Sequence, residues 1–168
     1  MIGVVTAVIG LAIQTGGIPI ERTVAIVGGQ AITMTDAQTA MVLGLVDASG
    51  DLTTAIERLV ERTLILREVE RYTPVEPTEA RIDQRLDQLR GQVSASQWER
   101  TLAAGGFSEA RLRGWLRDDL RITTYLDQRF SVTGGTGQSR EELIADWLSD
   151  LRRRTVVVEL WKVSPTPP

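Results

Sequence analysis

The chain has 168 residues, of which 42% are hydrophobic and 24% are charged, so its composition is that of a globular protein able to bury a core. The net charge is −3 and arginines are scattered among acidic residues, which argues against nucleic-acid binding. Cys and His are absent, and this excludes disulfides, thiolate nucleophiles, imidazole bases and the usual zinc sites.

Residues 1–20 contain no charged side chain, and Ile2–Ile13 form a dense apolar run. A secretory signal needs an apolar segment of about 7–15 residues followed by small residues, which Gly10 and Ala12 supply, although a basic start is missing. We expect residues 1–20 to be a signal peptide or N-terminal anchor of an exported protein of the periplasm or cell envelope. A retained membrane tether through residues 2–20 is the second choice, because a spanning helix needs about 20 apolar residues. A buried N-terminal helix is the third.

The next segment predicts a β-hairpin followed by a helix. Val24–Val27 are β-branched or small, Gly28–Gly29 suit a tight turn, and Gln30–Thr33 continue in an extended pattern. The first helix is expected to begin at Thr35 or Asp36, since both are good N-cap residues.

Apolar residues spaced three or four apart predict amphipathic helices over most of the remaining chain. The predicted stretches are 36–46, a second helix that begins at Asp51 or Thr53 and reaches 72, and then 78–93, 97–104 and 108–129. Prolines follow the second of these, and Gly105–Gly106 end the fourth.

The C-terminal part begins with a glycine-rich linker, Ser131–Gln138. Ser139 and Glu142 form a capping-box pattern that opens a helix reaching Arg152–Arg154, and Val156–Trp161 predict a strand before a tail at 164–168. We expect this strand and Val24–Val27 to share one sheet, since an isolated hairpin is only marginally stable. The predicted fold class is therefore mainly α, a helical bundle with a small β element formed by the N- and C-terminal strands.

Several segments resemble the SurA/PpiC family of exported chaperones. Val27–Thr33 is similar to the family pattern V-N-G-x-x-I-T, with Gly28 in place of Asn. Leu59–Arg71, Val75–Arg85 and Ala104–Leu120 resemble its successive helices, and Trp147–Trp161 resembles its C-terminal helix and strand. The resemblance covers about residues 22–163 and implies a SurA N-terminal-like chaperone domain.

One departure from that family affects the expected activity. Full-length relatives carry a parvulin prolyl-isomerase domain where this chain has only residues 131–138, and the parvulin site uses histidines and often a cysteine. The resemblance therefore implies a chaperone-like module without isomerase activity. We expect that the protein is not an enzyme and binds no cofactor.

Candidate peptide-binding residues are apolar side chains that could line a groove between helices. They are Met34, Met41, Trp98, Phe107, Trp115 and Trp161. Ordinary core packing is the competing interpretation for each of them, and it is favoured by burial statistics for single aromatic residues. No catalytic or metal-binding residue is predicted, because the adjacent acidic pairs diverge by about 100° on a helix and no serine has a neighbouring base.

The leading functional hypothesis is an ATP-independent exported chaperone that binds unfolded or nascent envelope polypeptides. The alternatives are a membrane-tethered structural adaptor of an envelope complex, and the non-catalytic part of a split peptidyl-prolyl isomerase. The sequence predicts polypeptide partners and no nucleic acid, and it does not define the oligomeric state.

Overall fold

The computed structural model describes residues 21–47, 49–72, 75–131 and 138–161. The predicted leader at 1–20, the tail at 164–168 and residues 132–137 of the predicted linker lie outside this part. In chain order the elements are β1 (Thr23–Val27), β2 (Gln30–Thr33), α1 (Met34–Val42), α2 (Leu52–Val69), the 3-10 turn η1 (Glu70–Tyr72), α3 (Glu79–Arg90), α4 (Ala95–Ala104), α5 (Glu109–Arg129), α6 (Arg140–Arg154) and β3 (Val157–Glu159).

The three strands form one antiparallel sheet in the order β2-β1-β3. Val27 pairs with Gln30 across the hairpin and with Val157 across β3. The prediction of a mainly helical protein with a small sheet made by its N- and C-terminal strands is thus confirmed. The β1–β2 register shifts between Thr23 and Ala25, and both Val24 and Ala25 are fully buried.

Side-chain caps fix where the helices begin, and two predicted starts were wrong. Thr33 caps α1, accepting a hydrogen bond from the Asp36 amide at 3.1 Å while the Asp36 carboxylate accepts from the Thr33 amide. Asp36 is therefore the third residue of a capping box and not the cap. Ser94 caps α4, so this helix begins at Ala95 instead of residue 97. The capping box at Ser139 and Glu142 is present as predicted.

Four elements also end earlier than predicted. Helix α2 ends at Val69 before the 3-10 turn that reaches residue 72, and α3 ends at Arg90 instead of residue 93. Helix α1 ends at Val42 rather than at 46, because Gly44 adopts a φ of +63° and turns the chain. Strand β3 covers only Val157–Glu159, although the Leu160 amide still donates to the Val24 carbonyl at 2.8 Å.

The buried apolar residues form two clusters. The larger one, called here the sheet-side core, lies among the sheet, α1, α2, α6 and the second half of α5, and includes Val24, Val27, Ala40, Ile56, Val60, Leu64, Val69, Ile122, Tyr125, Trp147 and Leu151. The smaller one, the arm core, joins α3 and α4 to the first half of α5 and consists of Leu43, Ile82, Leu86, Leu89, Trp98, Phe107, Leu112 and Leu116.

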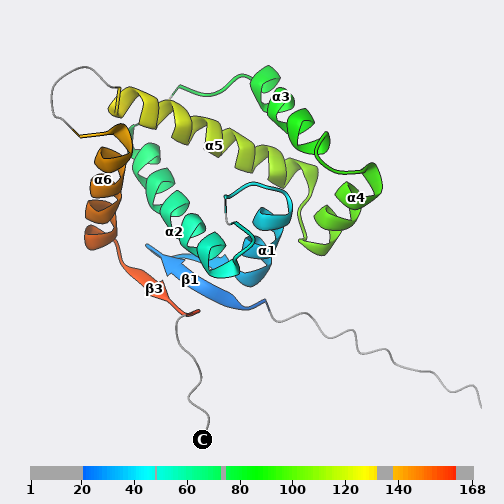
Figure 1. The fold of residues 1–168 in the computed structure, drawn as a ribbon, viewed down its shortest axis with the longest axis horizontal. Helices are drawn as coiled ribbons and strands as arrows, with labels where there is room; N and C mark the ends of the chain where they lie inside the picture. The colour runs from blue at the N-terminus through cyan, green and yellow to red at the C-terminus, as the bar shows by residue number, and fades with distance from the viewer. Residues whose placement is uncertain (1–20, 48, 73–74, 132–137, 162–168) are drawn as a thin grey trace, which may run out of the picture.

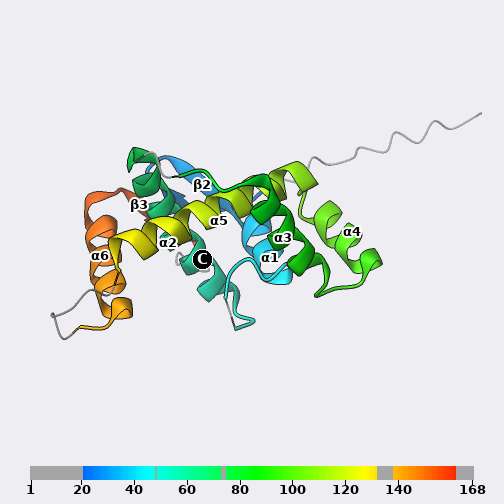
Figure 2. The same ribbon diagram turned by 90° about the horizontal axis from the view of Figure 1, so that it is seen from above.

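Helix α5 contributes to both clusters and runs along the body between α6 at one end and the α3–α4 arm (residues 79–104) at the other (Figure 1). The sheet lies against the side of α2 opposite to α5 (Figure 1). The view from above in Figure 2 again shows α6 and α4 at opposite ends of an elongated molecule. Among the described residues, no helix combines the length and apolar character needed to cross a membrane.

Candidate functional site

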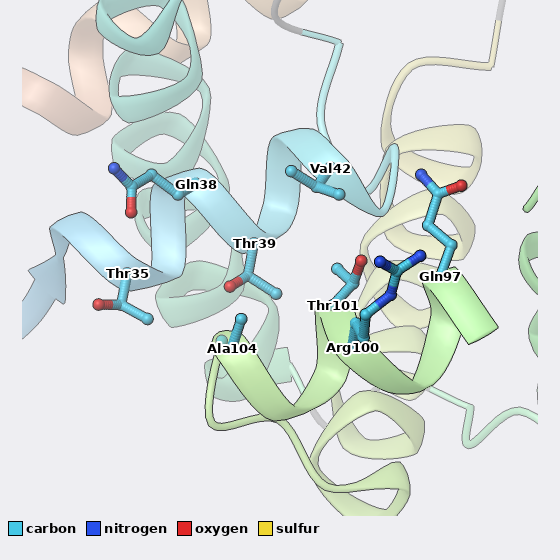
Figure 3. A pocket seen from close by; sticks show the side chains of 9 residues that line it. Thr35, Gln38, Thr39, Val42, Gln97, Arg100, Thr101 and Ala104 are labelled. Carbon is cyan, nitrogen blue, oxygen red and sulfur yellow. The ribbon is translucent and has the colours of Figure 1, made fainter.

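A groove runs between α1 and α4 and continues toward the start of the hairpin. It consists of two adjoining hollows of about 490 and 580 Å³ that share Thr35, Ala104 and Gly105. The first hollow is drawn in Figure 3 and is lined in addition by Gln38, Thr39, Val42, Gln97, Arg100 and Thr101. The second adds Glu21, Arg22, Met34, Ala103, Gly106 and Arg111. We refer to both together as the α1/α4 groove.

The close approach of the two helices at Gly105 sets the floor of this groove. A Cβ atom at Gly105 would overlap the side chain of Thr39, which is buried on α1. Only glycine fits there without moving one helix. The next residue, Gly106, has a φ of +60° and turns the chain toward buried Phe107. The helix-ending glycine pair thus also brings α4 against α1.

The lining of the α1/α4 groove combines small, apolar and neutral polar groups. Val42 is 54% exposed although it is a large aliphatic residue, and Met34 is half-buried at the far end. In Figure 3 the side chains of Thr35, Thr39 and Thr101 lie along the space between α1 and α4. Hydroxyl and amide groups of this kind can donate and accept hydrogen bonds with any polypeptide backbone. In the part of the chain that the structure describes, no group of three or more acidic, His or Cys residues gathers as a metal site would.

Arginine side chains give the α1/α4 groove its charge. Arg111 is paired with Asp36 at 2.7 Å and its guanidinium lies 4.3 Å from the centre of the Phe107 ring. Arg100 donates from Nε to the Ser96 carbonyl at 3.0 Å. Neither Arg100 nor Arg22 forms an ion pair with a carboxylate of the described residues.

A second polar cluster joins α2 to α5 and has a structural explanation. Arg62 donates to the Asp119 carboxylate at 2.7 Å and to the Trp115 carbonyl at 3.1 Å, and its guanidinium lies 4.0 Å from the centre of the Trp115 ring. Burial raises the pKa of Asp119, and the charge of Arg62 opposes this effect. Asp118 also approaches Arg62, at 4.0 Å. The adjacent carboxylates Asp118 and Asp119 therefore help to hold α5 against α2.

The six predicted peptide-binding residues do not gather in one place. Trp98 and Phe107 are buried in the arm core, with 7% and 4% exposure, and Trp115 is half-buried between the two cores. Met41 is half-buried on α1, and Trp161 packs against the sheet-side core. Met34 is the only one of the six that lines the α1/α4 groove.

Sequence reasoning missed the other lining residues of the groove. Arg100 and Gln97 were part of a predicted helix without a role, and Gly105 was interpreted only as its end. The available signal was a face of that helix, turned away from Trp98, that carries Gln97, Arg100, Thr101 and Ala104 and therefore has neither an acidic nor a large apolar side chain.

Comparison with protein-family models and with curated proteins gives no match for this chain. The resemblance to the SurA/PpiC family therefore remains a prediction based on the quoted segments.

Proposed function

We propose that the protein is an ATP-independent, exported chaperone-like protein that holds unfolded or nascent envelope polypeptides, without isomerase activity. The observation that supports this best is the α1/α4 groove. It is open along two adjoining hollows and lined by exposed Val42, half-buried Met34 and neutral hydrogen-bonding side chains. Such a lining suits an extended chain of varied sequence better than one small rigid ligand, which prefers an enclosed apolar pocket with few polar groups.

Blocking the α1/α4 groove tests this proposal. Ala104 lines both hollows and is exposed, so Ala104→Phe should fill the groove without disturbing a core. Ala145→Phe is the matched control, since Ala145 is also an exposed helical alanine but lies on α6. The parent protein and Ala145→Phe should suppress the aggregation of a chemically unfolded client without nucleotide, and Ala104→Phe should lose most of this effect.

Equal suppression by all three proteins would contradict a role for the groove, and no suppression by the parent protein at several-fold molar excess would contradict the chaperone function.

Export rests on the charge-free segment 1–20. N-terminal sequencing of the protein from cell fractions tests it, and an intact Met1 in a soluble cytoplasmic fraction would contradict it.

A structural adaptor is the second candidate, and the open edge of the sheet favours it. Strand β3 lies at the edge of the sheet, where Val158 within the strand is 41% exposed and the flanking residues Val156 and Leu160 are 75% and 38% exposed. An exposed apolar edge of this kind can pair with a strand of one fixed partner. Recovery of a single stoichiometric partner from envelope extracts, lost on Val158→Lys substitution, would favour the adaptor over the chaperone.

A further inference from the structure

We propose that the α1/α4 groove selects extended polypeptide segments that carry an acidic side chain, and that Arg100 binds this carboxylate. The inference rests on the proposed function, because it names the class of polypeptide that the same groove takes.

Arg100 is held in position by α4 while its terminal nitrogens stay available. The Nε–H donates to the carbonyl of Ser96, one turn earlier in the helix, at 3.0 Å. In Figure 3 the guanidinium points into the space between α1 and α4, near Thr101 and Gln97. With Nε engaged, the edge formed by Nη1 and Nη2 can still bind a carboxylate through two parallel hydrogen bonds.

Most other arginines of the described residues already have a carboxylate partner. On the adjoining arm, Arg90 pairs with Glu109 at 2.6 Å and Arg113 pairs with Glu79 at 3.0 Å. Arg100 contacts no carboxylate within the described ranges, although 22 acidic residues are present in the chain. A cation that lies in a groove without an internal counter-charge is suited to a charge supplied by a ligand.

The charge of the whole groove has the same sign. Three arginines, Arg22, Arg100 and Arg111, line it, and they face two carboxylates, the lining Glu21 and the carboxylate of Asp36, which pairs with Arg111 at 2.7 Å, so one positive charge is left in excess. The chain as a whole carries a net charge of −3, so this positive groove lies on an acidic protein. Charge complementarity therefore favours an acidic segment over a basic one.

The lining residues around Arg100 suit an extended backbone beside that carboxylate. Gln38 and Gln97 lie on opposite walls and can each donate and accept hydrogen bonds, and Val42 offers an apolar contact. The preferred segment thus alternates acidic with small aliphatic side chains. An internal Asp or Glu side chain is the proposed source of the carboxylate, because the groove continues past Arg100 toward Met34 and does not require a chain end.

The experiment measures the binding of short fluorescent peptides by polarisation to the full chain. The acidic probe alternates Glu with Val or Ala and ends in an amide. The matched probes replace every Glu with Gln, replace every Glu with Lys, or keep Gln and end in a free carboxylate. The protein variants are Arg100→Gln, Arg100→Glu and the control Arg81→Gln, since Arg81 is an exposed helical arginine on α3 that forms no ion pair within the described residues. Circular dichroism checks that each variant is folded.

We expect the acidic probe to bind about three- to tenfold more tightly than the Gln probe, the range for one partly exposed charge-assisted contact. Arg100→Gln should remove this difference, Arg81→Gln should keep it, and Arg100→Glu should reverse it in favour of the Lys probe. The reversal separates recognition of charge from a loss of structure.

Four results would overturn the inference. Equal binding of the acidic and Gln probes would do so while leaving the proposed function intact, because a polypeptide would still bind. Tight binding of only the probe with a free carboxylate would show that the groove binds chain ends. Equal losses of the preference for the acidic probe in Arg100→Gln and Arg81→Gln would show that this preference comes from general electrostatics. Failure of every probe to bind would overturn the proposed function as well.

Discussion

The two ends of the molecule are held together in different ways. At the sheet end, β1 and α2 are covered on several sides by β2, β3, α1 and α6, and Trp147 docks α6 through Tyr125 and Phe130 with ring centres 5.9 and 5.5 Å apart. At the other end, the α3–α4 arm contacts α5 through the smaller arm core and through ion pairs on the surface, such as those between Glu79 and Arg113 and Arg117. Burial of apolar area stabilises far more than exposed ion pairs do.

This difference places the α1/α4 groove between a well-buried wall and a weakly held one. Helix α1 belongs to the sheet-side core through Ala37 and Ala40, whereas α4 belongs to the arm core through Trp98. A binding groove with one less stable wall can adjust its width to different side chains, since locally unstable elements open first.

Removal of β3 should have the largest effect. Deleting residues 155–168 removes the hydrogen bonds from Gly28 to the Val156 carbonyl and from Leu160 to the Val24 carbonyl, both 2.8 Å long, and leaves buried β1 with only one neighbour. We expect a cooperative loss of stability at the sheet end that exceeds that of any single core substitution. Thermal unfolding by circular dichroism measures it, with a chain ending at Trp161 as control. Unchanged unfolding after the longer truncation would refute the importance of the shared sheet.

Substitution of one matched leucine in each core compares the stability of the two cores directly. Leu64 in the sheet-side core and Leu86 in the arm core are both 2% exposed. Each Leu→Ala substitution should lower the free energy of unfolding of the region that contains it by about 2–5 kcal/mol. Leu64→Ala should raise hydrogen exchange throughout the domain, whereas Leu86→Ala should raise it mainly in α3 and α4. The comparison fails if both variants exchange with the same pattern in native-state hydrogen-exchange mass spectrometry.

The smallest effect concerns the surface ion pairs of the arm. Hydrogen bonds from Arg117 and then Arg113 lower the pKa of Glu79. A lowered pKa means that the unfolded chain binds more protons in this range, so the contribution of Glu79 is present above its unfolded pKa and is lost as the pH falls through the folded value. Exchange protection in α3, corrected for intrinsic rates, should therefore fall slightly in acid, and Glu79→Gln should remove this pH dependence. A similar acid response in β1 would show that Glu79 is not its source.

The sequence predicted the helices and their order because these depend on local spacing and on caps such as Ser108 and Ser139. It predicted the shared sheet because an isolated hairpin is only marginally stable and needs a further strand. The start of α1 could not be decided locally, since Thr33, Thr35 and Asp36 are all residues that cap helices. Its end was misplaced because half-buried Leu45 and Val46 continue the apolar pattern after the backbone has turned at Gly44.

The candidate site was much harder to predict from the sequence than the fold. Arg100 and Thr39 are 61 positions apart, and nothing local shows that α4 ends against α1. The prediction instead selected large apolar residues, and two of these, Trp98 and Phe107, are buried in the arm core. Apolar character alone does not distinguish a groove from a core, whereas an unpaired charge at a helix contact is visible only once the helices are in place.

The antiparallel pairing of β1 with β3 also determines how the domain would respond to mechanical load. Thr23 begins β1 at the same end of the sheet at which Trp161 follows β3, and the Trp161 amide donates to the Val24 carbonyl at 3.2 Å. A force that draws these two points apart would act on one inter-strand hydrogen bond at a time, from Val24 toward Gly28, because the bonds lie perpendicular to the strands. The inter-strand hydrogen bonds would break one after another instead of bearing the load together in shear. Tension between Thr23 and Trp161 would therefore open this domain easily.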